Sequence, residues 1–284
     1  MTTPSARVLL DSISQAGHRV TTMEVVMHRF ALAEFNTHRV FSRNSASSRA
    51  IPVKKMIERV HSDIAYPVVW PSEKSGMSGG PEIGPHFVAN ARTRWSYAAE
   101  IMIEIAEEMS QIGVHKSVTN RLLEPFLWQT IIVTSTEWDN FFKQRISPGA
   151  QPELREAAIM MKIALELSQP QELVEDEWHM PLLQPDELDF YGALGEDMDE
   201  QRKWVSAARC ARVSYLTHDG RRDIEKDIEL YQRLVRDGHW SPLEHVCRPI
   251  DTDDVDGYGI GARGNLHGWV QLRHIEEDRK QSAR

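Results

Sequence analysis

The chain has 284 residues, of which 42 are acidic and 33 are Lys or Arg, so its formal net charge is −9 at pH 7. A hydrophobic fraction of 41% and a charged fraction of 26% are ordinary for a globular protein of one or two domains. The acidic balance excludes a protein that coats nucleic acid with a basic surface, and no apolar run reaches the ~18 residues of a membrane span. The N-terminus lacks a secretory signal pattern, and Cys210 and Cys247 are the only cysteines. We therefore expect a cytoplasmic protein with no disulfide, membrane or nucleic-acid partner.

The first half of the chain predicts strands and helices separated by irregular segments. Residues 20–35 begin with β-branched residues and continue with helical spacing, and the run TIIVTST at 130–136 favours a strand. Helices are predicted over 96–111, where apolar residues recur on one face, and over 152–168, where Pro152 occupies a favoured first position. The Gly- and Pro-rich residues 67–85 predict a long loop.

The second half predicts a different mixture. Residues 169–195 are acidic and Pro-rich, so we expect a long loop, linker or surface excursion there. Helices are predicted over 197–212 and 221–237, the second ending at Gly238. Because helices alternate with a few irregularly spaced strands, we predict a single α+β domain over 1–284, with a mixed or antiparallel sheet flanked by helices.

Two motif-like patterns carry little weight. Residues 259–264 match GxGxxG, but the preceding DTDDVD is no strand pattern, so we expect a flexible loop rather than a dinucleotide site. His239, Glu244 and His245 do not follow the spacing of a zinc motif. We predict no metal site.

The densest polar segment is THRVFSRNSASSRA, residues 37–50, which we call the motif loop. Arg39 and Arg49 lie ten residues apart with Ser and Asn between them. Guanidinium, hydroxyl and amide groups bind phosphates and ring carbonyls, although a solvated loop with capping serines has the same composition. Composition alone therefore leaves both interpretations open.

Four other segments accompany the motif loop: NRLLEP at 120–125, WDNFFKQR at 138–145, ARCARVSY at 208–215 and GHWSPLEH at 238–245. Together these segments resemble the flavin-dependent thymidylate synthase family, whose diagnostic motif reads RHRxxSxNxxSxRY. In that family the counterparts of the last two segments come first in the chain. The sequence therefore resembles a circularly permuted member, of a kind that a virus could encode and use in its host's cytoplasm.

The resemblance implies the family's α+β fold and a reaction that composition could not reveal. In the family, FAD mediates transfer of a one-carbon unit from methylene-tetrahydrofolate to C5 of dUMP, giving dTMP, and NADPH regenerates the reduced flavin. No enzyme cysteine attacks the pyrimidine, which agrees with the apolar neighbours of Cys210. The resemblance also implies a homotetramer whose active sites are shared between subunits, with small-molecule nucleotide and folate substrates.

The resemblance also implies roles for individual residues. Residues that match the family's nucleotide contacts are Glu34, Ser47, Arg49, Arg121 and Arg145. Residues that match its FAD contacts are His38, Arg39, Asn44, Asn140, Ser214, His239 and Ser241. Among them, Arg145 matches the arginine that grips and polarises the pyrimidine ring, which is the catalytic role; a surface salt bridge is the alternative.

Several positions depart from the family's pattern. Thr37 replaces an Arg, Ala50 a Tyr, Glu34 a Gln, Ser45 an acidic residue and Gly149 a His. Two alternative functions therefore stay open. One is a flavin-dependent hydroxymethylase acting at C5 of dUMP or dCMP, as viruses with modified DNA require, because a carboxylate at Glu34 could hold a water or a cytosine amino group. The other is an inactive nucleotide- or flavin-binding module.

The segment GNLHGWVQLRH, residues 264–274, matches none of the motifs. We expect it to supply a further helix, with Gln271 and Arg273 facing the site.

Overall fold

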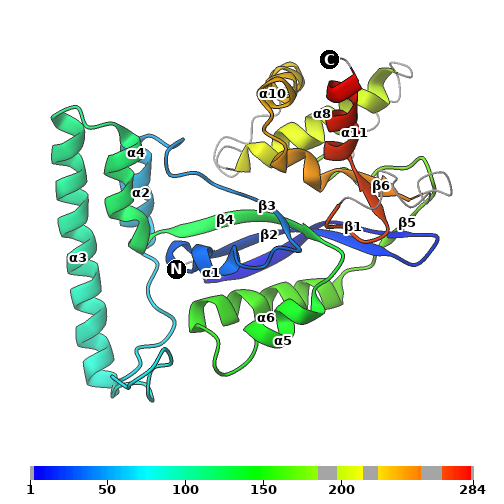
Figure 1. The fold of residues 1–284 in the computed structure, drawn as a ribbon. Helices are drawn as coiled ribbons and strands as arrows, with labels where there is room; N and C mark the ends of the chain where they lie inside the picture. Colours follow the sequence, from blue (N-terminus) through cyan, green and yellow to red (C-terminus); the bar gives the residue numbers. More distant parts are fainter. Residues whose placement is uncertain (1–2, 185–196, 214–222, 251–263, 283–284) are drawn as a thin grey trace.

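The computed structural model describes residues 3–184, 197–213, 223–250 and 264–282. A five-stranded sheet forms its centre, with two helices beneath it, the C-terminal helices above it and a helical arm at one end (Figure 1). The α+β prediction is confirmed, and the sheet is of the mixed kind.

The strands are β1 (Ser5–Ser14), β2 (Arg19–His28), β3 (Ser42–Ser45), β4 (Trp128–Ser135), β5 (Gln171–Leu173), β6 (Cys247–Pro249) and β7 (Trp269–Gln271). The central sheet has the order β3-β4-β2-β1-β5, and its strands are antiparallel except β5, which runs parallel to β1. Strands β6 and β7 form a separate antiparallel pair.

The helices of the first two thirds are α1 (Leu32–Phe35), α2 (Val53–Ser62), α3 (Pro85–Gln111), α4 (Lys116–Thr119), α5 (Asp139–Arg145) and α6 (Pro152–Leu167), with 3-10 helices η1 (Arg29–Ala31) and η2 (Asn120–Phe126). The C-terminal third adds α8 (Asp197–Ala211), α10 (Ile224–Asp237), η3 (Ser241–His245) and α11 (Leu272–Ser282). No described helix combines the length and apolar character needed to cross a bilayer.

One face of the sheet carries the main apolar core. Alternate residues of β2 and β4 point to it, and α6 packs against them with a stripe at helical spacing. Core residues that are 0% exposed include Met23, Val25, Met27, Ile131, Val133, Leu154 and Met161. Burial of this face fixes the register of β2 and β4, because a one-residue slip would turn every apolar side chain away from α6.

The opposite face of the sheet carries a row of hydroxyl groups. In the strand register Thr22 lies opposite Thr134, and Thr134 lies opposite Ser42. All three are buried beneath the C-terminal third of the chain. The two threonine hydroxyls hydrogen-bond each other and the buried imidazoles of His179 and His245. The C-terminal third therefore docks on the sheet partly through satisfied polar groups.

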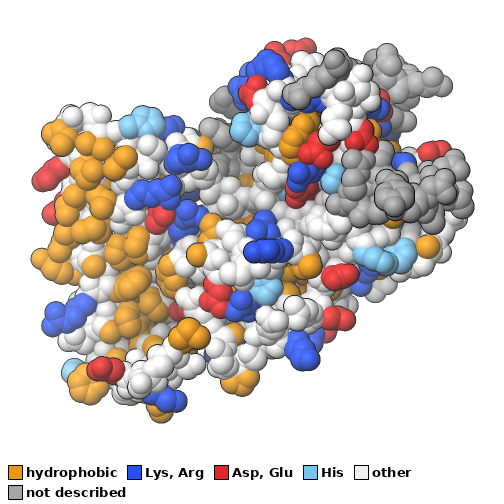
Figure 2. All heavy atoms as spheres, in the orientation of Figure 1, with side chains coloured by type: hydrophobic (Ala, Val, Ile, Leu, Met, Phe, Trp, Pro, Cys, Tyr) orange, Lys and Arg blue, Asp and Glu red, His pale blue; other side chains and the backbone are white. Residues whose placement is uncertain are grey.

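Helix α3 forms the arm and is poorly covered. Of its 27 residues, only Ala99, Ile103 and Ala106 are buried. Phe87 and Tyr97 are 64% and 63% exposed, and Figure 2 shows apolar side chains gathered along this part of the molecule. An exposed apolar surface of this kind is typical of an interaction site.

Most predicted elements are confirmed, with three changes in extent. The predicted helix 96–111 starts earlier, at Pro85, and the strand in 20–35 spans Arg19–His28. The predicted helix 221–237 begins at Ile224, and Gly238 ends it in the left-handed conformation with φ 73°.

The two predicted loops differ in outcome. Residues 67–85 contain one isolated bridge before α3 begins, so the loop is confirmed. The prediction for 169–195 is wrong at its N-terminal end: Gln171–Leu173 join the central sheet, and His179 is 0% exposed. Three residues are too few to produce a strand pattern in a sequence. Residues 185–196 of this segment, and most of the GxGxxG match, lie outside the described residues.

We predict that Leu154→Ala destabilises the fold by about 2–5 kcal/mol, because it opens a cavity between α6 and the sheet. Leu167→Ala on the same helix, at a side chain 78% exposed, should change the free energy of unfolding by less than about 0.5 kcal/mol. Urea denaturation of both variants measures the difference, and equal effects would contradict the core assigned to α6.

Candidate functional site

The motif loop is held in shape by one half-buried guanidinium group. Arg43 Nη1 donates to the backbone carbonyls of His38 and Phe41 at 3.0 and 2.9 Å. Its Nε and Nη2 donate to the side chain and the backbone carbonyl of Asn36 at 2.9 and 2.8 Å. A single planar fork therefore orders residues 36–43 without a metal or a disulfide.

Arg145, the last residue of α5, lies against the start of this loop. Its Nη1 is paired with the carboxylate of Glu34, its Nε donates to His38 Nε2 at 2.8 Å, and its Nη2 donates to Thr37 Oγ1 at 3.3 Å. The Arg145 side chain is 16% exposed. Burial, together with the guanidinium groups of Arg145 and Arg43, lowers the pKa of His38, which stays neutral and can accept this hydrogen bond.

The loop opens onto a cavity of about 490 Å³, a volume within the usual range of ligand sites. Its lining residues come from the motif loop, from η3 and from the C-terminal segment around β7. They are Arg39, Phe41, Arg43, Ser241, Glu244, Gly264, Asn265, Gln271, Arg273 and His274. Segments far apart in the sequence thus converge on one cavity.

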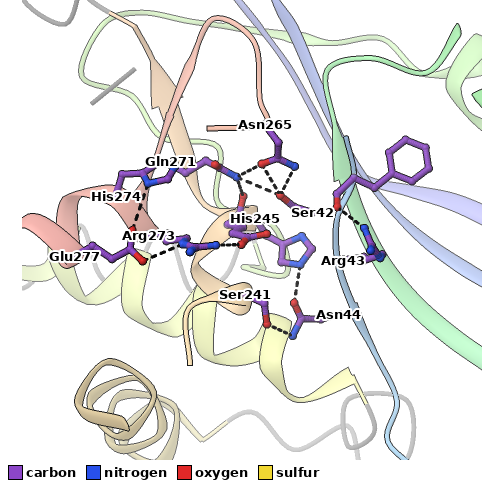
Figure 3. A network of polar contacts seen from close by, with 12 residues as sticks. Ser42, Arg43, Asn44, Ser241, His245, Asn265, Gln271, Arg273, His274 and Glu277 are labelled. Atoms are coloured by element: carbon purple, nitrogen blue, oxygen red, sulfur yellow. Dashed lines mark hydrogen bonds and ion pairs between the residues drawn. The ribbon is translucent and has the colours of Figure 1, made fainter. Parts of the chain in front are cut away.

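A polar network forms the wall of this cavity (Figure 3). Gln271 Nε2 donates to Ser42 Oγ at 3.1 Å, to Asn265 Oδ1 at 3.0 Å and to the backbone carbonyl of Glu244 at 2.9 Å. Arg273 is paired with Glu244 and lies 3.2 Å from Glu277 Oε1. Gln271 and Arg273 both line this cavity, but the predicted helix begins only at Leu272, so Gln271 belongs to strand β7 and Arg273 to helix α11.

Asn44 connects the motif loop to η3. Its amide lies 3.1 Å from His245 Nε2 and 3.4 Å from Ser241 Oγ. His245 Nδ1 in turn lies 2.8 Å from Thr134 Oγ1 on β4. Asn44 and Ser241 are both predicted FAD contacts. Ser241 lines the cavity, whereas Asn44 is not among the lining residues and contacts Ser241 (Figure 3).

The predicted nucleotide residues at the far end of the loop form a second group. Arg121 Nη1 donates to Glu124 Oε1 at 2.8 Å, and the same oxygen accepts from Ser48 Oγ at 2.7 Å and from Arg29 Nη2 at 3.1 Å. Asn120 Nδ2 donates to the carbonyl of Ser48 at 2.7 Å, which ties the turn bearing Ser47 and Arg49 to η2. Arg49 is exposed at this turn.

Two predicted FAD contacts, Asn140 and His239, are not among the residues that line the cavity. Asn140 is exposed on α5, where Gln144 Nε2 donates to its Oδ1 at 3.1 Å. His239 follows Gly238 and is also exposed. Ser214 lies outside the described residues. Residues to which the resemblance assigned no role complete the site: Ser42, Glu124, Glu244, His245 and Asn265. Ser42 is a fixed serine of the motif itself. Glu244 and His245 are the last two residues of the GHWSPLEH segment, so this motif could have predicted them.

Comparison with protein families identifies the chain. Residues 11–171, more than half of the sequence, match the family described as thymidylate synthase complementing protein. The chain belongs to this family. No curated protein matches the chain.

Membership of this family of flavin-dependent thymidylate synthases indicates an enzyme of the thymidylate synthase type with a small-molecule nucleotide substrate. The matched part contains the motif loop, η2 and α5, and it ends in β5. The C-terminal third, with α8 and η3, follows the match.

Both cysteines of this thymidylate synthase family member are buried. Cys210 and Cys247 are 0% exposed, and burial raises the pKa of each thiol well above its usual value. For Cys210 this burial agrees with its apolar neighbours in the sequence. Burial of this kind disfavours the thiolate form that a nucleophilic cysteine needs, and neither residue lines the cavity.

Two fully buried imidazoles make the stability of this family member depend on pH. Burial lowers the pKa of His179 and of His245 to about 3, from an ordinary value of 6.5. Below pH 6.5 the unfolded state therefore binds more protons than the folded state. We predict that the free energy of unfolding falls as the pH drops from about 6.5 toward 3, by up to about 1.4 kcal/mol per pH unit for each imidazole.

Urea denaturation between about pH 5 and pH 7 measures this slope, and His245→Asn should reduce it. His239→Asn replaces an exposed imidazole and should leave the slope unchanged. An unaltered slope in folded His245→Asn protein would show that His245 does not carry the effect.

Proposed function

We propose that the protein transfers a one-carbon unit from methylene-tetrahydrofolate to C5 of dUMP and releases dTMP, with FAD as cofactor and NADPH as reductant. Bound FAD, once reduced, supplies the hydride that brings the transferred carbon to the methyl level. The observation that carries the proposal is the convergence of Arg145, Glu34 and His38 at the motif loop, beside a cavity that η3 helps to line.

The cavity residues suit a ligand that bears phosphate groups. Arg39 is exposed at the cavity wall and complements a diphosphate, whereas Arg43 and Arg273 are engaged within the protein. Ser241 offers a hydroxyl group at the cavity wall, with the Asn44 amide 3.4 Å from it, and this hydroxyl can bond the polar edge of a flavin ring. These groups support FAD as the occupant.

Arg145 is suited to stabilising charge on the pyrimidine. Its guanidinium is oriented by the neutral His38 on one side and by Glu34 on the other. C5 is nucleophilic when the ring carries enolate-like negative charge shared between C5 and a ring carbonyl oxygen, and a preorganised guanidinium donor stabilises the charge on that oxygen. Glu34 is the first partner that a bound nucleotide would meet there.

Glu34 also favours a second candidate function, C5 hydroxymethylation of dUMP or dCMP. A carboxylate replaces the family's neutral amide at this position and is paired with Arg145. It can accept a hydrogen bond from a water or from a cytosine amino group. Hydroxymethylation adds the methylene carbon and a water-derived hydroxyl and consumes no net hydride, whereas methylation consumes one hydride per product.

We also propose that the chain acts as a homotetramer with shared sites. Arg145 and Glu34 lie at the start of the motif loop, whereas Arg49 and Arg121 lie at its far end, beyond β3. In the assembly that we propose, a second copy brings its Arg49 and Arg121 to the Arg145 and Glu34 of the first copy, which completes the nucleotide site. The poorly covered apolar face of α3 offers a surface for such association.

We further propose that the family's two remaining segments lie at 208–215 and 238–245 in permuted order. The family match ends at residue 171, yet Ser241 and His245 reach the Asn44 side chain of the motif loop. These long-range contacts support the assignment of the C-terminal third to the same active unit.

The experiment that tests the function uses the full-length protein with FAD, methylene-tetrahydrofolate, NADPH and either dUMP or dCMP. Mass spectrometry identifies the product, and NADPH oxidised per product separates the two candidates. One NADPH per methylated product supports the synthase, and a product with an added hydroxymethyl group and no NADPH consumption supports the alternative. FAD binding without any product would support an inactive module, and no binding of FAD at all would refute every flavin-dependent function.

We predict that Arg145→Ala lowers kcat/KM for the nucleotide by about 10²–10³-fold while FAD binding persists, because the guanidinium acts on the transition state. Lys143→Ala, an exposed position on the same helix, is the matched control and should retain activity. Wild-type turnover by Arg145→Ala would remove the catalytic role assigned to Arg145.

We predict that activity depends on neither cysteine. Cys210→Ser with Cys247→Ser should cost about 1–3 kcal/mol of stability, because each hydroxyl is buried in an apolar site. Methylene transfer should continue in the folded, FAD-loaded double variant. Loss of all product from that variant would reinstate covalent catalysis by a thiolate.

A further inference from the structure

A continuous chain of hydrogen bonds runs through the centre of the molecule, from β1 to the motif loop. His179 bridges two strands: its Nδ1 lies 2.9 Å from Ser12 Oγ, and its Nε2 lies 2.8 Å from Thr22 Oγ1. Thr22 Oγ1 lies 2.6 Å from Thr134 Oγ1, which continues the chain across the sheet.

From Thr134 the chain reaches the wall of the cavity. Thr134 Oγ1 lies 2.8 Å from His245 Nδ1, and His245 Nε2 lies 3.1 Å from the amide of Asn44. The members of this buried chain are Ser12, His179, Thr22, Thr134, His245 and Asn44. All but Asn44 are at most 1% exposed, so each must find its hydrogen-bond partners within the chain or its immediate surroundings.

The number of protons in the buried chain restricts it to two arrangements. Burial lowers the pKa of both imidazoles to about 3, so at neutral pH each ring has one N–H donor and one bare nitrogen that accepts. Each threonine hydroxyl also has one proton to donate. Among the described residues the two threonine hydroxyls have partners only within this chain, so each donates its proton along it, and fixing the direction of one hydrogen bond fixes all the others.

The amide of Asn44 fixes that direction. Figure 3 draws its oxygen toward His245, an orientation in which this oxygen also faces two backbone carbonyl oxygens. The reverse orientation places the amide nitrogen 3.1 Å from the carbonyl of Arg43, 3.2 Å from the carbonyl of Ser241 and 3.1 Å from His245 Nε2. Only a nitrogen can donate to two carbonyls, so the NH₂ group belongs on this side.

The other bonds then follow in order. The Asn44 NH₂ group faces His245 Nε2, and an amide nitrogen does not accept a hydrogen bond, so Nε2 is the bare nitrogen. His245 therefore carries its proton on Nδ1 and donates to Thr134. Thr134 donates to Thr22, and Thr22 donates to His179 Nε2. His179 therefore carries its proton on Nδ1 as well, and donates it to Ser12 Oγ.

We infer that His179 and His245 are positioning residues, each held as the Nδ1–H tautomer, which fix the Asn44 amide with its carbonyl oxygen toward Ser241. The Asn44 oxygen then faces the hydroxyl of Ser241, which lines the cavity, and so fixes the direction in which this hydroxyl meets the bound ligand. The inference rests on the proposed function only in taking that ligand to be FAD.

The tautomers are measured without any ligand. Nitrogen NMR of protein labelled with ¹⁵N-histidine distinguishes a protonated ring nitrogen from a bare one, and His179→Gln and His245→Gln assign the two signals. We expect both residues to be neutral with Nδ1 protonated between about pH 5 and pH 8. An Nε2–H tautomer at either residue, or titration of either ring within that range, would overturn the inference.

The effect on the ligand is measured with FAD. Thr134→Val removes the central hydroxyl without a change of shape and should weaken FAD binding about tenfold. Thr134→Ser keeps the hydroxyl and should restore affinity. Thr21→Val is the matched control, because Thr21 is equally buried on β2 but donates to Asp11, outside the buried chain. Thr134→Val should add nothing to Asn44→Ala, since both act through the same amide.

Unchanged FAD affinity in folded Thr134→Val, or an equal loss in Thr21→Val, would overturn the positioning role. If wild-type protein fails to bind FAD, the proposed function fails instead, and the tautomer measurement alone decides the inference.

Discussion

The structure depends on the need to satisfy hydroxyl groups buried on one face of the central sheet. Thr22 and Thr134 lie at the middle of this face and are completely covered. An unpaired buried hydroxyl costs on the order of 1–3 kcal/mol, so the covering segment must supply partners at the correct height and spacing. His179 and His245 supply these partners. Hydrogen bonds need defined distances and directions, so they restrict the position of the covering segment on the sheet more than apolar contact alone would.

The two faces of the sheet therefore contribute differently: one stabilises the fold, and the other positions the site. The face against α6 is apolar and supplies stability, because its residues bury without polar cost. The hydroxyl face supplies position: it places η3 beside the motif loop, so that Ser241 meets Asn44 at the cavity wall. A site that depends on orientation gains from being anchored to strands rather than to other loops.

The sequence pattern predicted the strands, helices and helix ends that depend on residues close together in the chain. The β-branched run of β4, the apolar stripe of α6 and the glycine after α10 are set by neighbours in the sequence, and each was predictable. The motif segments likewise located Arg145, Asn44 and Ser241, because a motif records residue types at fixed spacing. Spacing carried no information on the pairing of His179 with Thr22, which are separated by 157 positions. Nor did it reveal that Glu124 would join Arg121, since a surface glutamate beside an arginine is an ordinary pattern.

The order of segments along the chain matters less to such a site than the contacts that close it. Asn44 and Ser241 are separated by 197 positions, yet the entropy of closing a loop rises only with the logarithm of its length. A chain that carries the family's segments in permuted order therefore loses little stability, provided that the same hydroxyls, imidazoles and amide meet at the end. Folding rate is more sensitive, because long-range contacts form slowly. Once the sheet and α6 have formed, the two imidazoles select the docking geometry that leaves neither Thr22 nor Thr134 unpaired.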